Sequence, residues 1–188
     1  MSEPQDLLNE LPVDEARAAL FRCCGSRRWV AEMLARRPWP SAATLYADAG
    51  AVWAAMGRDD ILEAFAQHPR IGGAEGAWTE LGCAQRSPSR EGAGTLSGFP
   101  QSIDAWSRAE QSGTADADAE TKRALREAND RYFARFGYIF IVCATGKSAA
   151  EMLALVQQRL HNDPTRELAI AAAEQARITR LRLEKLGA

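Results

Sequence analysis

Apolar residues recur every three or four positions along most of this chain, in segments separated by proline, glycine or a capping side chain. That spacing gathers side chains on one face of an α-helix, whereas a strand alternates at every second position. Alanine, the strongest helix former, occurs 36 times, against 12 valine and isoleucine residues together. At 188 residues, the chain predicts one all-α domain, a bundle of about eight helices.

Capping residues and helix breakers set the expected boundaries. Ser26, Ser41, Ser148 and Asp163 precede apolar-periodic segments and can cap them. Gly25, Gly57 and Gly137 follow such segments, and Pro69 pushes the residue before it out of the α region. We expect helices over about 12–24, 26–37, 41–56, 59–67, 102–112, 116–136, 148–161 and 163–188.

Two segments depart from the helical pattern. Residues 70–100 hold seven of the 14 glycines and show no sustained apolar period, which predicts a long flexible loop or insertion. Residues 138–143, Tyr-Ile-Phe-Ile-Val-Cys, form the one short β-rich run. The run is too brief for a sheet, so we expect an extended connection through the core.

Charge and hydropathy exclude several partners. The formal net charge is −2, so no basic surface for nucleic acid is expected. No apolar run reaches the length of a membrane-spanning helix, and the first ten residues lack the order of a secretory signal. A cytoplasmic protein is predicted, and the sequence is compatible with a homodimer. The four cysteines, at positions 23, 24, 83 and 143, are expected to be reduced thiols.

Neither a metal nor a cofactor is indicated. The two histidines and four cysteines lack the spacing of a metal-ligand set, and glycine fingerprints for dinucleotides are missing. Residues 144–148, Ala-Thr-Gly-Lys-Ser, resemble the end of a phosphate-binding loop. That motif needs glycine at 141, where the chain has Ile141, so a helix cap at Ser148 is the better interpretation.

The last helix carries an arginine on its apolar face. At 100° per residue, Arg182 falls with Leu168, Ala171, Ile178 and Leu186. An inward guanidinium needs an anionic partner, from either the protein or a ligand. A structural salt bridge and a ligand-binding role are both open on this geometry.

His68 shows the same pattern, because it shares a helical stripe with Ile61 and Phe65. An inward histidine is more often structural than catalytic, yet it can also transfer protons. The other histidine, His161, lies at a helix end, where a capping or surface role is expected.

Ser107, Glu110 and Gln111 lie one helical turn apart and on the same face as Ile103. An exposed polar face is the simplest interpretation. Together with an inward histidine and arginine, however, these side chains would supply an acid-base group, an anion anchor and orienting hydrogen bonds.

Four blocks of the chain resemble the OHCU (2-oxo-4-hydroxy-4-carboxy-5-ureidoimidazoline) decarboxylases of urate breakdown. They occur in order and span nearly the whole chain. The blocks are Gln67-His68-Pro69-Arg70-Ile71-Gly72, Trp106-Ser107-Arg108-Ala109-Glu110-Gln111-Ser112-Gly113, Arg135-Phe136-Gly137-Tyr138-Ile139-Phe140-Ile141-Val142-Cys143-Ala144 and Ile178-Thr179-Arg180-Leu181-Arg182-Leu183.

The resemblance implies a carboxy-lyase that needs no cofactor or metal and acts on a small ureide to give (S)-allantoin. It implies His68 as the catalytic histidine, assisted by Glu110. It also implies a set of ligand-contacting residues, of which the last three act through main-chain groups: Pro69, Ser107, Gln111, Arg182, Phe140, Ile141 and Val142.

Two other functions are consistent with the residues alone. A non-catalytic helical adaptor or small-molecule-binding protein would use Arg182 and Glu110 as a structural ion pair. A hydrolase acting on a preceding ureide would need an activated water or a nucleophile, and the sequence indicates neither.

Overall fold

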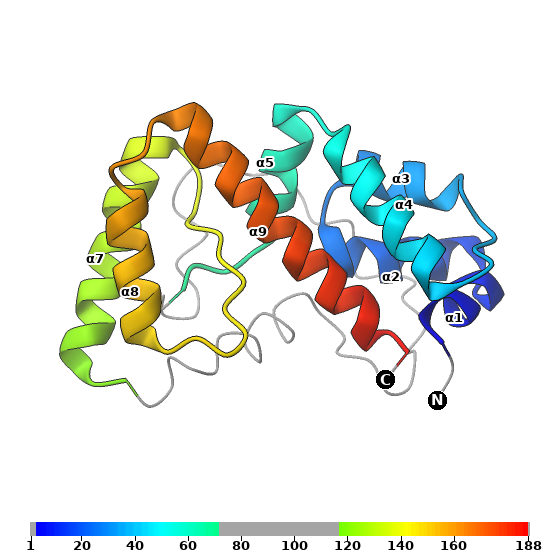
Figure 1. Cartoon of the computed structure of the whole chain (residues 1–188), viewed down its shortest axis with the longest axis horizontal. Coiled ribbons are helices and arrows are strands. Elements are labelled where there is room, and N and C mark those ends of the chain that lie inside the picture. The colour runs from blue at the N-terminus through cyan, green and yellow to red at the C-terminus, as the bar shows by residue number, and fades with distance from the viewer. Residues whose placement is uncertain (1–2, 72–116, 188) are drawn as a thin grey trace.

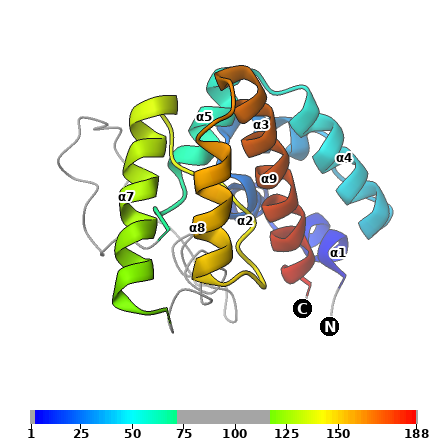
Figure 2. The same cartoon turned by 60° about the vertical axis from the view of Figure 1, so that its left-hand side comes forward.

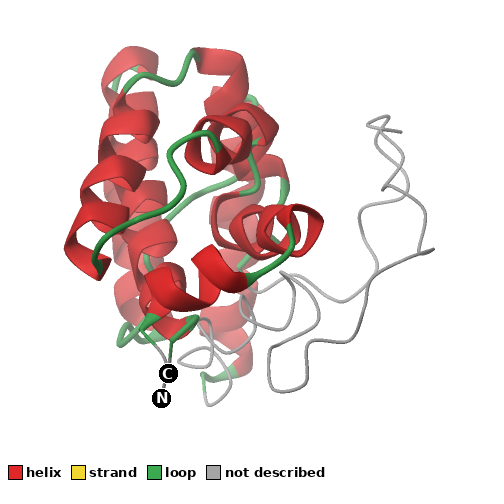
Figure 3. Cartoon of the chain, turned by 90° about the vertical axis from the view of Figure 1, so that its right-hand side faces the viewer, coloured by secondary structure: helices red, strands yellow, loops and turns green. Residues whose placement is uncertain are grey.

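The computed structural model describes residues 3–71 and 117–187, and within these ranges every regular element is a helix (Figure 3). The all-α prediction is confirmed. The loop predicted over 70–100 lies outside the described residues, apart from its first two positions, and so does the helix predicted over 102–112. The described helices are α1 (Pro4–Glu10), α2 (Val13–Cys24), α3 (Arg27–Leu34), α4 (Ala42–Ala54), α5 (Arg58–Ala66), α7 (Ala119–Phe136), α8 (Ala149–Arg159) and α9 (Pro164–Lys185).

Helix boundaries follow the predicted caps. The side chains of Ser26 and Ser41 accept backbone N–H bonds at the starts of α3 and α4. Ser148 forms a capping box with Glu151 at the start of α8, which confirms its capping role. Asp163 caps α9, with proline in the first helical position. These signals are visible in sequence because each cap is satisfied within three residues.

The sequence prediction missed α1 (Pro4–Glu10). Its N-cap residue, Glu3, makes no side-chain capping bond, so the local start signal is Pro4 at the first helical position. Leu8 is fully buried, and Gln5 is buried although it is polar. Tertiary packing against the neighbouring helices therefore stabilises α1.

Helix α9 runs diagonally between two groups of helices (Figure 1). One group contains α1 to α4, and its core includes Trp29, Trp39 and Leu45 together with Leu183 of α9. The other contains α7 and α8, and its core includes aromatic residues of both α7 and the segment that follows it. Because α9 contributes to both cores, it fixes how the two groups sit relative to each other.

The segment after α7 is extended, as predicted, and residues 139–144 form no strand. It returns the chain along the length of α7, so that α8 can run beside α7 in the same direction (Figures 1 and 2). Its residues 138–142 are all buried. This segment lies beside α8 and bonds to α9 through Cys143, whose backbone N–H donates to Glu174 Oε2 at 2.8 Å.

Candidate active site

A tight contact between two helix ends positions the turn that carries His68. Gly25, which ends α2, has φ of 81°, and a Cβ placed there would lie 2.7 Å from Gln67 Cγ. Only glycine accommodates both the left-handed backbone and this close approach. The end of α5 is thereby seated against the corner between α2 and α3, with the His68 N–H donating to the Phe65 carbonyl at 3.1 Å.

We expect Gly25→Ala to lower the free energy of unfolding by more than the roughly 1–2 kcal/mol of a left-handed alanine, because Gln67 must also move. Gly137→Ala is the matched control, since Gly137 has φ of 79° but a Cβ placed there would meet no atom within 4 Å. Urea unfolding of both variants measures the difference. Equal losses would show that the contact with Gln67 is unimportant.

The imidazole of His68 is enclosed. The residue is 8% exposed, and its Nε2 atom has no hydrogen-bond partner among the described residues. Burial, and secondarily the positive charge of Arg182, lower the pKa of His68 to about 3, while an interaction with Gln175 acts in the opposite direction. His68 is therefore neutral at neutral pH in the free protein.

This depressed pKa predicts how stability depends on pH. Below about 6.5 the unfolded chain binds a proton at His68 that the folded chain does not bind until about pH 3. Stability should therefore fall as pH falls through this window, by up to about 1.4 kcal/mol per pH unit from this group. Urea unfolding of wild type and His68→Asn between pH 7.5 and 5 isolates the contribution of His68, because the two proteins share all other titrating groups. Parallel curves would contradict the depressed pKa.

Arg182 points into the protein, as the periodicity of the last helix predicted. It is 1% exposed, and its Nη1 donates to the Arg22 carbonyl at the end of α2 at 3.3 Å. The rest of the predicted face agrees: Ala171, Ile178 and Leu186 are buried, and Leu168 is half-buried. Helix α9 thus brings a buried cation close enough to His68 to lower its pKa.

The extended segment presents backbone groups in the core. Phe140, Ile141 and Val142 are each less than a tenth exposed. Within the described residues, their three N–H groups donate to no protein acceptor. Buried backbone donors are normally paired, so contact of these three N–H groups with a ligand stays a prediction.

The structure brings together part of the predicted site. His68 and Arg182 are close, and Pro69 is half-buried in the turn after His68. The other three predicted side chains, Ser107, Glu110 and Gln111, lie outside the described residues. The expected contacts of Glu110, with Arg182 or with His68, therefore stay predictions.

Sequence reasoning assigned no role to three buried polar residues. Gln175 lies on the predicted inward face of α9 and is fully buried, but its interaction with His68 depends on how α5 packs against α9. Arg159 is 6% exposed and Glu167 fully buried. Glu167 resembled an ordinary acidic residue in the first turn of a helix, so no local signal marked it.

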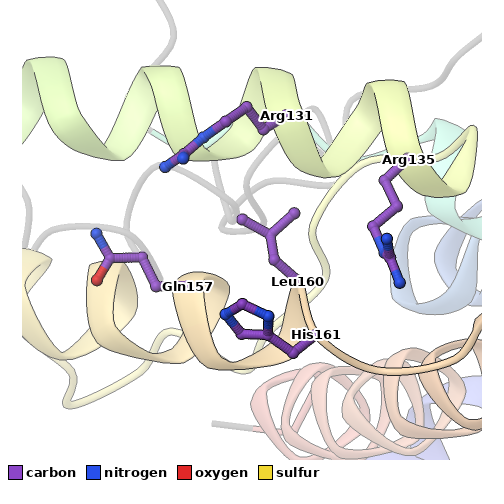
Figure 4. Close-up of a pocket in the computed structure, with 5 residues that line it drawn as sticks. All are labelled: Arg131, Arg135, Gln157, Leu160 and His161. Carbon is purple, nitrogen blue, oxygen red and sulfur yellow. The ribbon is translucent and has the colours of Figure 1, made fainter.

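A groove of about 610 Å³ lies between α7 and α8 (Figure 4). Its walls contain Arg131, Arg135 and His161, all exposed, and none of the predicted site residues. The surface position of His161 agrees with the sequence prediction.

The described residues contain no candidate metal site, because no group of three acidic, histidine or cysteine side chains among them could hold a metal ion. Cys23, Cys24 and Cys143, the cysteines of the described ranges, are not disulfide-bonded, and Cys83 lies outside these ranges. No helix of the described ranges is both long and apolar enough to cross a membrane.

Two curated proteins are similar to this chain. The chain is 34% identical over 164 residues to the uric acid degradation bifunctional protein TTL of Arabidopsis thaliana, covering 87% of the chain and 45% of the relative. It is 34% identical over 86 residues to the 2-oxo-4-hydroxy-4-carboxy-5-ureidoimidazoline decarboxylase of Amia calva, covering 45% of the chain and 49% of the relative. The matches thus span about half the length of these curated relatives.

Solved structures show the same fold. A crystal structure of an OHCU decarboxylase in the presence of (S)-allantoin superposes with a TM-score of 0.67 and 32% identity, covering 88% of this chain and 94% of that one. An (S)-allantoin synthase superposes with a TM-score of 0.63 at 17% identity, covering 97% of this chain and 53% of that one. The second likeness concerns the fold alone.

Within the described ranges, the fold and the site define an all-helical protein with a buried histidine close to a buried arginine, and with an extended core segment. Residues 9–184 match the OHCU decarboxylase family. The chain belongs to this family, as the four sequence blocks indicated.

Proposed function

We propose that this protein is a carboxy-lyase that decarboxylates 2-oxo-4-hydroxy-4-carboxy-5-ureidoimidazoline to (S)-allantoin in urate breakdown. The observation that carries the proposal is the pairing of family membership over residues 9–184 with a buried neutral His68 close to Arg182. A histidine in that environment can transfer a proton, and a buried guanidinium attracts a carboxylate.

The chemistry needs three things from the protein. When the carboxylate leaves as CO2, the electron pair of the broken C–C bond stays on the ring carbon and spreads into the adjacent unsaturated group. The protein must hold the carboxylate, stabilise the carbanion and supply a proton to that carbon. None of these steps requires a metal or cofactor, and the proposed reaction uses neither.

His68 is assigned the proton transfer, with Glu110 orienting it, and Arg182 is assigned to an anionic or carbonyl group of the substrate. A substrate carboxylate beside His68 favours the imidazolium, because an opposite charge nearby stabilises it. Substrate binding thereby opposes the burial and the Arg182 charge that lower the pKa of His68 in the free protein. Binding of the substrate therefore favours a protonated His68, which can then donate its proton to the carbanion.

The remaining contacts set the pose. Ser107, Gln111 and the backbone of residues 140–142 hold the ureido and ring amides, and Pro69 packs against the ligand. Fixing both faces of the carbanion directs the proton to one side, which selects one enantiomer of allantoin. A homodimer and a cytoplasmic location stay predictions of the sequence.

The experiment is to supply freshly prepared substrate and to follow CO2 release and the optical activity of the product. We expect CO2 to be released faster than in the spontaneous, racemising reaction, and the product to have a larger optical activity. Equal rates and racemic allantoin with folded protein would contradict the proposal and favour a non-catalytic binding protein.

A further inference from the structure

A buried arginine outside the predicted site is attached to the extended segment. Arg159, at the end of α8, donates from Nη1 to the Ile141 carbonyl at 2.8 Å. Its guanidinium also lies over the Phe140 ring, 4.6 Å from the centroid. One side chain therefore holds two consecutive residues of the segment whose N–H groups lack a protein acceptor within the described ranges.

Planarity of the peptide bond turns this contact into an orientation. The Ile141 carbonyl and the Val142 N–H belong to one trans peptide unit, in which the two groups point in opposite directions. Because Arg159 fixes the carbonyl toward itself, the Val142 N–H must point to the other side of the segment. Arg159 thus orients the Val142 N–H, although it bonds only to the Ile141 carbonyl of the same peptide unit.

The next peptide unit is fixed from another helix. The Cys143 N–H donates to Glu174 Oε2 of α9 at 2.8 Å, so the Val142 carbonyl points away from that carboxylate. Both peptide units that flank Val142 are therefore held, one from α8 and one from α9. A donor held on both sides needs no reorganisation when a ligand arrives.

A second set of contacts fixes Arg159 itself. Its Nη2 and Nε atoms lie 2.6 and 2.8 Å from Glu167 Oε1, and both side chains are nearly or fully buried. The Tyr132 hydroxyl donates to the same carboxylate oxygen, and Asn162 Nδ2 donates to Glu167 Oε2 at 2.7 Å. A buried ion pair is weak support for stability as such, but this one leaves Arg159 a single orientation.

We propose that Arg159, held by Glu167, is a positioning residue for ligand binding, which directs the Val142 N–H to an acceptor oxygen of a ureide ligand. This inference rests on the proposed function, because it takes the ligand to be a ureide. It adds two residues, Arg159 and Glu167, that touch no part of the ligand.

The test begins with the wild-type protein. The chain has five valines, so labelling with [15N]valine gives five backbone amide resonances, and the one missing from Val142→Ile identifies position 142. Titration with (S)-allantoin is expected to move the Val142 amide proton downfield, as for a donor that gains a hydrogen bond. An unmoved Val142 resonance at saturation would overturn the inference and does not depend on whether any other variant folds.

Arg159→Lys then tests the positioning. Lysine keeps a positive charge beside Glu167 but cannot reach Glu167 and the Ile141 carbonyl together as a planar fork does. We expect KM for the substrate and Kd for (S)-allantoin to rise about tenfold, with kcat changed less than about twofold. The Val142 resonance should respond less to the ligand than in wild type.

Tyr132→Phe is the matched control. It removes the hydrogen bond to Glu167 and the long one, at 3.5 Å, that the hydroxyl accepts from Arg159 Nη2, and it keeps both the aromatic ring and the contact of Arg159 with Ile141. It should lose stability and keep its affinity for (S)-allantoin. If Arg159→Lys and Tyr132→Phe weaken binding by the same factor, the network is structural and the inference fails.

The outcomes separate this inference from the proposed function. A wild-type protein that releases CO2 and binds (S)-allantoin without moving the Val142 resonance overturns the inference alone. A folded wild-type protein that does neither overturns the proposed function, and the inference fails with it.

Discussion

Replacing His68 with asparagine is expected to lower kcat for decarboxylation by about 10²- to 10⁴-fold, the usual contribution of a positioned acid-base group. Asparagine keeps a polar side chain but cannot titrate. The Nε2 atom of His68 has no hydrogen-bond partner within the described ranges, so its removal breaks no described bond of that atom. Circular dichroism should therefore show an unchanged helical content.

His161→Asn is the control for this variant, because His161 is exposed at the end of α8 and should be dispensable. Steady-state kinetics on both variants, corrected for the spontaneous reaction, gives the comparison. Retention of more than about a tenth of wild-type kcat in His68→Asn would remove His68 from the proton-transfer role.

Replacing Arg182 with glutamine is expected to weaken binding of (S)-allantoin by about ten- to hundredfold. A hydrogen bond to a charged group contributes about 1.5–3 kcal/mol, which corresponds to that range of affinity. If Arg182 serves the ligand, the loss of affinity should exceed the loss of stability. Calorimetric titration and thermal unfolding in one buffer measure the two quantities.

Arg180→Gln is the matched control from the same helix. Arg180 is exposed and its Nε lies 2.6 Å from Glu184 Oε1 on the surface, so its loss should alter affinity little. A large drop in Tm for Arg182→Gln with unchanged affinity would show that Arg182 is a structural partner inside the bundle. The role of an anion anchor would then be withdrawn.

Local sequence signals account for most of the helix boundaries. The left-handed glycines Gly25 and Gly137 and the caps Ser148 and Asp163 lie where the sequence predicted. Each of these residues satisfies backbone groups within about four positions of itself, so the necessary partners are adjacent in sequence. Helix α1 lacks such a cap, and its existence depends on the burial of Leu8.

Periodicity likewise identified which side of α9 is buried, and with it the inward position of Arg182. The same reasoning identified His68 as inward on the stripe of Phe65. Roles for these two residues came from the four family-like blocks, because an inward position alone is also consistent with a purely structural residue. Ser107, Glu110 and Gln111 stay predictions of the sequence.

By itself, then, the sequence determined the helical class, most helix ends and the inward faces, since all of these depend on neighbours within one helix. Only the tertiary structure decided how the buried charges are compensated. Arg159, Glu167 and the Ile141 carbonyl come from α8, α9 and the extended segment, and no spacing in the chain predicts that they meet. The physical reason is that a buried charge is tolerated only with a partner, and here different elements supply the partners.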